Sequence, residues 1–171
     1  KDYDISRLTV HKYMNRELQL YSISRRRKLS YKRGIAHKVY NNKLKQDFNS
    51  PEINRKWCTD FTYLFLTDGS KRYNCTIIDL YDRSVVTGIS DRNITSDPAK
   101  RTLQKAIDSQ PGIDLHKLML HSDQGSQYTS KEFTEYCESL GITQSMSKAE
   151  YPYDNAPMEG YFNTLKNDLI Y

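Results

Sequence analysis

Long hydrophobic runs are absent from this chain of 171 residues. No apolar stretch approaches the roughly 18 residues that a membrane-spanning helix needs, and no secretory signal peptide is visible. The sequence therefore predicts a soluble protein with no membrane partner. Its length suits one domain with a proper hydrophobic core and a small appendage.

Cysteine is scarce, and its three positions, Cys58, Cys75 and Cys137, are odd in number. They lack the paired spacing of CxxC motifs, so the sequence suggests neither a disulfide framework nor a zinc site. This cysteine usage fits a reducing, cytoplasmic compartment.

Positive charge is concentrated at one end of the chain, although the formal total is only +5. Residues 1–50 hold 13 Lys and Arg against 4 Asp and Glu, a net of +9, while residues 51–171 hold 13 against 17, a net of −4. A basic arm joined to a mildly acidic core predicts a nucleic-acid partner for the arm. The alternative is a solvated basic linker that has no specific partner.

The first part of the arm, residues 7–22, has the pattern of a short amphipathic helix. Val10, Met14 and Leu18 recur at a spacing of four, and Thr9 is a candidate N-cap. Residues 24–50 lack apolar periodicity and predict a flexible basic linker that lies along phosphates. The cations proposed for this contact include Arg25, Arg26, Arg27 and Lys28.

The core is expected to begin near Pro51 and to have an α/β fold. Three closely spaced strands predict an antiparallel meander, and a strand that follows a helix is expected to run parallel to its neighbour. The expected elements are strands at 56–66, 71–80, 84–90, 117–122 and 143–146, and helices at 95–108, 130–140 and 155–169.

Three acidic residues stand at positions where such a fold would place a site. Asp123 follows an apolar run, so it is expected at the carboxyl end of a buried strand, where open α/β sheets bind ligands. Read alone, that acid could equally cap the next helix. Asp60 lies in an aromatic strand, and Glu159 lies in the first turn of the last helix, for which Asn155 is the candidate N-cap.

The residues around these acids form three motifs in order. They read Trp57-Cys58-Thr59-Asp60, then His121-Ser122-Asp123-Gln124-Gly125-Ser126-Gln127-Tyr128, then Asp154-Asn155-Ala156-Pro157-Met158-Glu159. Together they resemble the catalytic core of DDE transposases and retroviral integrases, and most closely the OrfB transposase of insertion-sequence-three-type bacterial elements. The resemblance covers roughly residues 50–171. It implies a ribonuclease-H-like mixed five-stranded sheet with flanking helices.

The resemblance also implies a DDE-type polynucleotidyl transferase that uses two Mg²⁺ or Mn²⁺ ions. Hard cations take oxygen ligands, and a pair of them can activate a nucleophile and stabilise a leaving group in phosphodiester chemistry. In this interpretation Asp60 bridges both ions, and Asp123 and Glu159 each complete one site. The expected reactions are metal-dependent hydrolysis and strand transfer during DNA recombination.

Other residues near the motifs are candidates for DNA contact. Lys166 and Asn163 follow Glu159 by seven and four positions, so they share its helix face. Lys166 could equally be an exposed helix lysine. Gln124 and Gln127 lie beside Asp123 and are expected to orient DNA or water.

Four further positions carry their own expectations. His121 shares the strand side of Asp123 and could either orient DNA or pack in the core. Asp79 and Asp82 read as turn formers, and Asp154 reads as a dipole partner of the last helix. Gly160 departs from the larger residue that is usual in the family at this position.

The resemblance implies the following organisation and partners. Residues 1–50 would be a partial helix-turn-helix segment with a basic linker, and residues 51–171 an integrase-like core that is truncated at its carboxyl end. DNA would be the substrate, a homo-oligomer the active form, and a small protein from the same element a possible partner, in the bacterial cytoplasm at the nucleoid. The alternatives are a catalytically inactive DNA-binding remnant and a ribonuclease-H-type nuclease.

Overall fold

The computed structural model describes residues 5–20, 36–149 and 151–169. The chain divides into two compact units, Lys1–Lys32 and Arg33–Tyr171. Within the described residues, no helix is both long enough and apolar enough to cross a lipid bilayer.

The smaller unit contains the α-helix α1 (Arg7–Lys12), which continues as a π-helical turn, η1 (Tyr13–Glu17). The helix is shorter than the predicted range, and the predicted cap is wrong. The hydroxyl of Ser6 accepts a hydrogen bond from the backbone N–H of Thr9 at 3.2 Å, so Thr9 lies inside the helix. Ser6 can cap because its backbone is extended, whereas Thr9 is already helical.

The larger unit is built on a five-stranded sheet with the strand order β3-β2-β1-β4-β5. The β1–β2 and β2–β3 pairs are antiparallel and the β1–β4 pair is parallel, as the sequence predicts, and the β4–β5 pair is also parallel. The elements are β1 (Lys56–Phe65), β2 (Lys71–Asp79), β3 (Val85–Asp91), α2 (Ser96–Asp108), η2 (Leu115–Lys117), β4 (Met119–Ser122), α3 (Lys131–Ser139), β5 (Thr143–Met146), η3 (Pro152–Asn155) and α4 (Ala156–Leu169).

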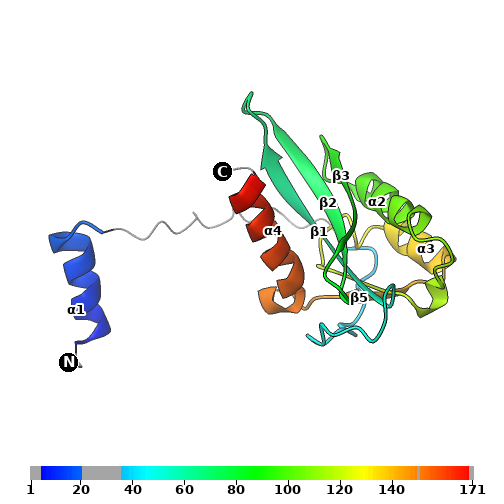
Figure 1. The fold of residues 1–171 in the computed structure, drawn as a ribbon, viewed down its shortest axis with the longest axis horizontal. Helices are drawn as coiled ribbons and strands as arrows, with labels where there is room; N and C mark the ends of the chain where they lie inside the picture. Colours follow the sequence, from blue (N-terminus) through cyan, green and yellow to red (C-terminus); the bar gives the residue numbers. More distant parts are fainter. Residues whose placement is uncertain (1–4, 21–35, 150, 170–171) are drawn as a thin grey trace. The chain divides into compact units, whose positions relative to one another are not determined.

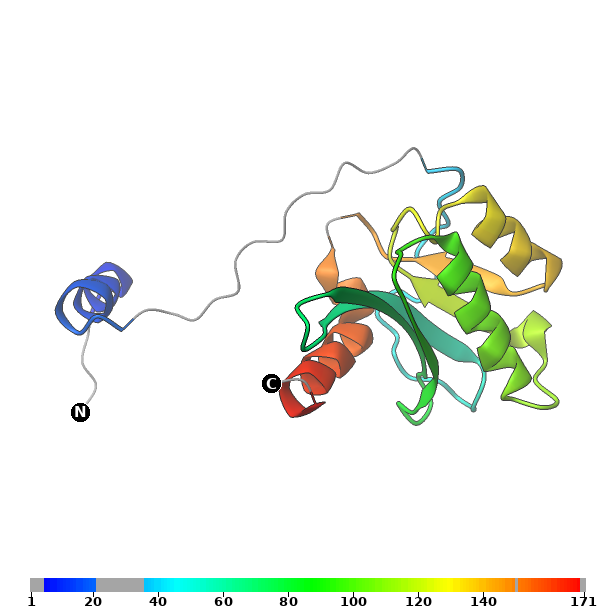
Figure 2. The same ribbon diagram turned by 90° about the horizontal axis from the view of Figure 1, so that it is seen from above.

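Helices cover both faces of this sheet, with α2 and α3 on one side and α4 on the other (Figures 1 and 2). On the first face, Trp57 and Leu120 pack with Leu103 of α2 and Phe133 of α3. On the second face, the buried residues are Leu44, Cys58, Ile78, Leu80, Met158 and Phe162. Alternate residues of β1 therefore enter different cores, because successive strand side chains point to opposite faces.

Residues 36–50 belong to the larger unit and pack against its core, whereas the sequence predicts a linker that extends to the start of the core near Pro51. Leu44 is only 2% exposed, and the backbone N–H groups of Lys43 and Leu44 donate to the hydroxyl of Ser145 at 2.9 and 3.1 Å. One buried leucine and one strand hydroxyl thus anchor a segment that has no periodic pattern of its own.

The three cysteines are free and buried. Burial raises the pKa of the Cys58 and Cys137 thiols to about 12, and it raises the pKa of Cys75 above its ordinary value. Buried thiols of this kind pack as small apolar residues and are chemically inert. Their contribution to this protein is therefore to packing.

Asp79 is a buried acceptor for three donors, at the end of β2. Its carboxylate accepts hydrogen bonds from the backbone N–H of Asn54 at 2.6 Å, the indole N–H of Trp57 at 3.1 Å and the backbone N–H of Tyr81 at 2.8 Å. The side chain is 1% exposed. Asp79 thus does more than form a turn, because it also ties the segment before β1 to the sheet.

Candidate functional site

Asp60 lies in β1, and Asp123 directly follows β4, the strand that pairs with β1 in parallel. In the β1–β4 register, Cys58 is the partner of His121. Continuing this register by two residues places Asp123, which directly follows β4, next to Asp60. Both acids then lie on the sheet face that carries Cys58, which is the face covered by α4.

Short backbone hydrogen bonds orient both carboxylates, which are half-buried. An oxygen of Asp60 accepts from the backbone N–H of Phe61 at 2.7 Å, and an oxygen of Asp123 accepts from the backbone N–H of Gly125 at 2.9 Å. The second bond spans two residues and forms the turn that ends β4. Two oriented carboxylates side by side are a donor set that suits a hard divalent cation.

Glu159 is placed differently from the other two acids. It is the fourth residue of α4 and is exposed, whereas its neighbour Met158 is fully buried against the sheet. Among the residues that the structure describes, no three His, Cys, Asp or Glu side chains form a group that could hold a metal ion. The β1–β4 register therefore puts Asp60 and Asp123 at the same edge of the sheet, and Glu159 lies on the helix that covers the face they share.

Asp154 connects the start of α4 with two other segments. Its carboxylate, 3% exposed, accepts hydrogen bonds from Asn42 Nδ2 at 2.8 Å, Gln46 Nε2 at 2.9 Å and the backbone N–H of Lys148 at 2.9 Å. Burial alone would raise the pKa of Asp154, but these three hydrogen bonds outweigh it and hold the pKa below its ordinary value. This ionised carboxylate fixes the chain immediately before the helix that carries Glu159.

Asn155 does not cap α4, contrary to the sequence prediction. It already lies in the 3₁₀ turn η3, and neither its Nδ2 nor its Oδ1 has a hydrogen-bond partner within the described ranges. The side chain is only 6% exposed. A buried polar group without a partner costs about 1–3 kcal/mol. This unsatisfied amide, four residues before Glu159, is a second feature of the site that the sequence did not indicate.

His121 is a core residue, which decides between the two roles left open by the sequence. It is fully buried, with Nδ1 2.9 Å from the hydroxyl of Ser145 and Nε2 3.1 Å from the hydroxyl of Ser147. Burial lowers the pKa of His121 to about 4, and a hydrogen bond with the backbone of Asp154, together with the charge of its carboxylate, opposes this shift without cancelling it. The imidazole is therefore neutral at physiological pH.

The neutral state of His121 makes stability depend on pH. The pKa of His121 is about 4 in the folded protein and 6.5 in the unfolded chain. The neutral imidazole therefore contributes fully to the free energy of unfolding above pH 6.5, and this contribution is lost as the pH falls towards 4. The loss is about 3 kcal/mol of unfolding free energy over this window. Urea unfolding of the wild type and of His121→Gln at several pH values measures it. The wild type should lose more stability than the variant between pH 6.5 and 4, and parallel curves would contradict the assignment.

The candidate DNA-contact residues differ in exposure. Gln124 Nε2 donates to the carbonyl of Ser147 at 2.9 Å, and Gln127 is only 8% exposed, so both lie within the loop structure. Asn163 is exposed, and Lys166 is half-buried with its Nζ 5.0 Å from the ring centroid of Tyr63. The predicted phosphate-binding cluster of Arg25, Arg26, Arg27 and Lys28 lies outside the described residues.

Gly160 is not required by packing, because a Cβ at this exposed position would meet no atom within 4 Å. Glycine inside a helix costs about 0.5–1 kcal/mol relative to alanine. We therefore expect Gly160→Ala to raise the free energy of unfolding by about that amount, measured by urea denaturation. Gly141→Ala is the control, since φ there is +73° and a Cβ would lie 2.3 Å from the His116 ring, so this change should destabilise. Destabilisation by Gly160→Ala would show that the position needs glycine.

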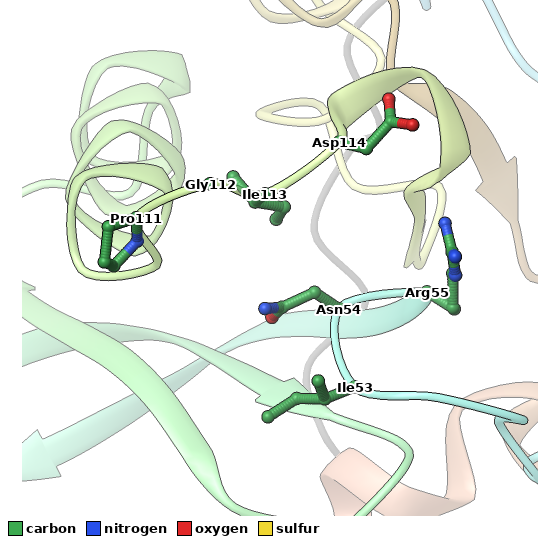
Figure 3. Close-up of a pocket in the computed structure, with 7 residues that line it drawn as sticks. All are labelled: Ile53, Asn54, Arg55, Pro111, Gly112, Ile113 and Asp114. Carbon is green, nitrogen blue, oxygen red and sulfur yellow. The ribbon is translucent and has the colours of Figure 1, made fainter.

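A small pocket of about 240 Å³ lies away from these acids, at the amino end of β1. Figure 3 shows Pro111, Gly112 and Ile113, on the loop after α2, facing Ile53 and Asn54 on the segment before β1. Its remaining lining residues are Arg55 and Asp114. Their charges are paired outside the pocket, with Glu52 and Lys117 respectively, so the pocket has few groups to orient a ligand.

A mixed sheet of this order with helices on both faces has the ribonuclease-H-like arrangement. Residues 50–152 match the model of the family described as the integrase core domain. The chain belongs to the integrase core domain family.

Curated relatives of the chain are transposases. It is 35% identical over 174 residues to the probable transposase for insertion sequence element IS1353 of Shigella flexneri. That alignment covers 98% of this chain and 32% of the relative. It is 34% identical to the putative transposase InsK for insertion sequence element IS150 of Escherichia coli strain K12, over 81% of this chain and 48% of the relative. The chain thus spans between a third and a half of the length of these two relatives.

Solved structures with the same fold are retroviral. The catalytic core domain of BIV integrase matches with a TM-score of 0.53 and 20% identity, over 67% of this chain and 68% of that one. The HTLV-2 integrase catalytic core domain in complex with magnesium matches with a TM-score of 0.51 and 22% identity, over the same shares. These similarities confirm the predicted fold.

Proposed function

We propose that this chain carries the catalytic core of a DNA transposase that cuts and joins DNA strands by metal-dependent phosphodiester chemistry. The observation that supports this most strongly is the parallel register of β1 and β4, whose continuation puts Asp60 next to Asp123 on one sheet face, in a member of the integrase core domain family. Carboxylates of like charge repel one another at short range. A structural role explains such a pair poorly, whereas a cation site explains it well.

In this proposal Asp60 and Asp123 hold divalent cations, Mg²⁺ or Mn²⁺, and Glu159 completes the site. Two such ions supply an activated oxygen nucleophile and neutralise the charge of the leaving oxygen. The HTLV-2 integrase core, which shares the fold, is in complex with magnesium, and this supports the choice of metal. Glu159 lies at the exposed start of α4, and the hydrogen bonds of Asp154 hold the chain immediately before that helix in place.

The proposed substrates are the DNA ends of the element and a target strand. Water would attack first at the element end, and the released 3′-hydroxyl would then attack the target phosphodiester. A structural neighbour with a TM-score of 0.62, 21% identical over 79% of this chain and 45% of that one, is a simian T-cell lymphotropic virus intasome in complex with PP2A regulatory subunit B56 gamma. This neighbour supports an oligomeric active form. A small partner protein from the same element and a bacterial cytoplasmic, nucleoid location remain part of the proposal.

Calorimetric titration with Mn²⁺ tests the metal site. We expect the wild-type chain to bind Mn²⁺ more tightly when DNA is present, and Asp60→Asn and Asp123→Asn each to weaken that binding about tenfold or more. Asp108→Asn is the matched control, because Asp108 is an exposed acid at the end of α2. If the wild type binds DNA in a salt-sensitive way but binds no Mn²⁺, the inactive DNA-binding remnant becomes the better account.

A further inference from the structure

The β1–β2 hairpin extends beyond the strands that flank it. Pairing of β2 with β3 reaches only Tyr73, and pairing of β1 with β4 reaches only Cys58, while the two hairpin strands remain paired with each other up to Phe65 and Lys71. Figure 1 shows this hairpin projecting past its neighbours, with α4 beside it. The residues at the tip of the hairpin therefore pair only with each other and with no third strand.

Two neighbouring aromatic rings lie between two cations on this projecting hairpin and the adjacent helix. Lys166 Nζ of α4 lies 5.0 Å from the ring centroid of Tyr63, and the rings of Tyr63 and Phe65 lie 6.0 Å apart with an interplanar angle of 79°. Lys71 Nζ lies 5.5 Å from the ring centroid of Phe65. These four side chains form a continuous aromatic–cation row in which each ring contacts a cation and the other ring.

The rings of this row are unusually open to solvent for strand aromatics. Tyr63 is 39% exposed and Phe65 is 45% exposed, and the adjacent Leu66 is 41% exposed. Exposed apolar groups that are clustered on a protein surface often mark an interaction site. The hairpin thus presents a ring pair that packing within the chain does not account for.

The position and charge of the row favour a nucleic acid over an apolar protein surface. The row begins at Lys166, two helical turns after Glu159 on α4, and runs to the hairpin strands. The acid of the hairpin turn, Asp68, uses its carboxylate to accept from the backbone N–H of Ser70 at 2.8 Å. Single-strand binding sites combine aromatic rings, which stack on bases, with cations, which contact phosphates.

We propose that the aromatic–cation row binds unpaired bases at the end of the DNA on which the site acts. The proposal rests on the proposed function and deepens it, because it gives the site a surface that separates frayed from fully paired ends. Tyr63 and Phe65 stack on the bases, and Lys71 and Lys166 neutralise the neighbouring phosphates. The rings supply affinity for any base sequence, because every base has a π-face.

Fluorescence anisotropy with two DNA probes tests this inference. The probes share one duplex sequence, and one carries a short unpaired 3′ tail that contains 2-aminopurine; EDTA is present, so no cleavage occurs. We expect the double variant Tyr63→Leu with Phe65→Leu to lose about tenfold or more in affinity for the tailed probe and no more than about twofold for the blunt one. The 2-aminopurine quenching seen with the wild type should disappear as well.

Two further variants keep the test decisive. Tyr81→Leu removes a tyrosine that is still more exposed, at 56%, and lies beyond the opposite end of β2; this variant should bind both probes as the wild type does. Tyr63→Phe with Phe65→Tyr exchanges the rings and should retain tailed-probe binding, which separates stacking from a folding defect in the leucine variant.

Three outcomes would overturn the inference. These are equal losses on both probes, no loss on either, or a wild-type dimer in sedimentation that the leucine variant abolishes, since the last would make the row a protein interface. None of them bears on the metal site, because binding is measured without metal. The proposed function would fall separately, if Asp60→Asn and Asp123→Asn left Mn²⁺ binding unchanged.

Discussion

Replacing Asp123 with asparagine should reduce metal-dependent cleavage of element-end DNA by about 10³-fold or more and leave the fold intact. Asparagine keeps the shape of the side chain, and its amide oxygen can still accept from the backbone N–H of Gly125. It removes the negative charge that a cation needs, which in metal-assisted catalysis is worth several kcal/mol, and about 4 kcal/mol corresponds to 10³-fold. The measurement is the rate of strand cleavage with Mg²⁺ and with Mn²⁺, together with the melting temperature.

The control for this experiment is Asp108→Asn, which removes the same charge from an exposed helix end. It should cleave at the wild-type rate. Cleavage by Asp123→Asn at a rate close to that of the control would remove Asp123 from the catalytic site. A large fall in its melting temperature would instead make the residue structural.

Asp79→Ala, in contrast to Asp123→Asn, should destabilise the fold, with a loss of about 3–5 kcal/mol in the free energy of unfolding. The substitution removes the charged acceptor of the buried indole N–H of Trp57 and of the part-buried backbone N–H groups of Asn54 and Tyr81. A hydrogen bond to a charged group contributes about 1.5–3 kcal/mol. Part of the sum is recovered, because the indole N–H keeps Asn54 Oδ1 at 3.2 Å as an acceptor and solvent can reach the two part-buried groups. Urea denaturation measures the loss.

Asp82→Ala is the matched control for Asp79→Ala, since Asp82 is an exposed turn acid whose carboxylate accepts from the backbone N–H of Ser84 at 2.9 Å. It should change stability little. Equal stabilities of the two variants would show that Asp79 is only a turn residue. Taken together, the Asp123 and Asp79 substitutions separate an acid that acts on a substrate from one that holds the fold.

The elements of the core could be predicted because their signals are local. Ser130 does cap α3, accepting from the backbone N–H of Phe133 at 3.2 Å, and Gly141 ends that region at a φ of +73°. The parallel direction of β4 could be predicted because a strand that follows a helix runs parallel to its neighbour. Sequence motifs then pointed to the family, which the integrase core match confirms.

The long-range hydrogen bonds could not be predicted, because their partners are far apart in the sequence. Asp154 is bound by Asn42 and Gln46, over a hundred positions earlier, and nothing local indicates that residues 36–50 pack on the core. The alternating aromatics Tyr63 and Phe65 indicated a strand, and only the short reach of the flanking strands leaves them exposed. The available signal for the aromatic–cation row was Lys71, which follows the hairpin turn and pairs with Phe65.

The cap at Asn155 was predicted wrongly for a related reason. A 3₁₀ turn precedes α4, so the chain is already helical where the cap was expected, and the amide is buried without a partner in the described part of the chain. Departures from local rules of this kind concentrate at functional sites. Here the departure lies four residues before Glu159.

Manganese anomalous scattering from crystals grown with element-end DNA tests the central claim most directly. The account predicts an anomalous peak within bonding distance of carboxylate oxygens of both Asp60 and Asp123, with Glu159 drawn in beside it. Manganese bound elsewhere, or no peak at saturating Mn²⁺ in the presence of DNA, would contradict it.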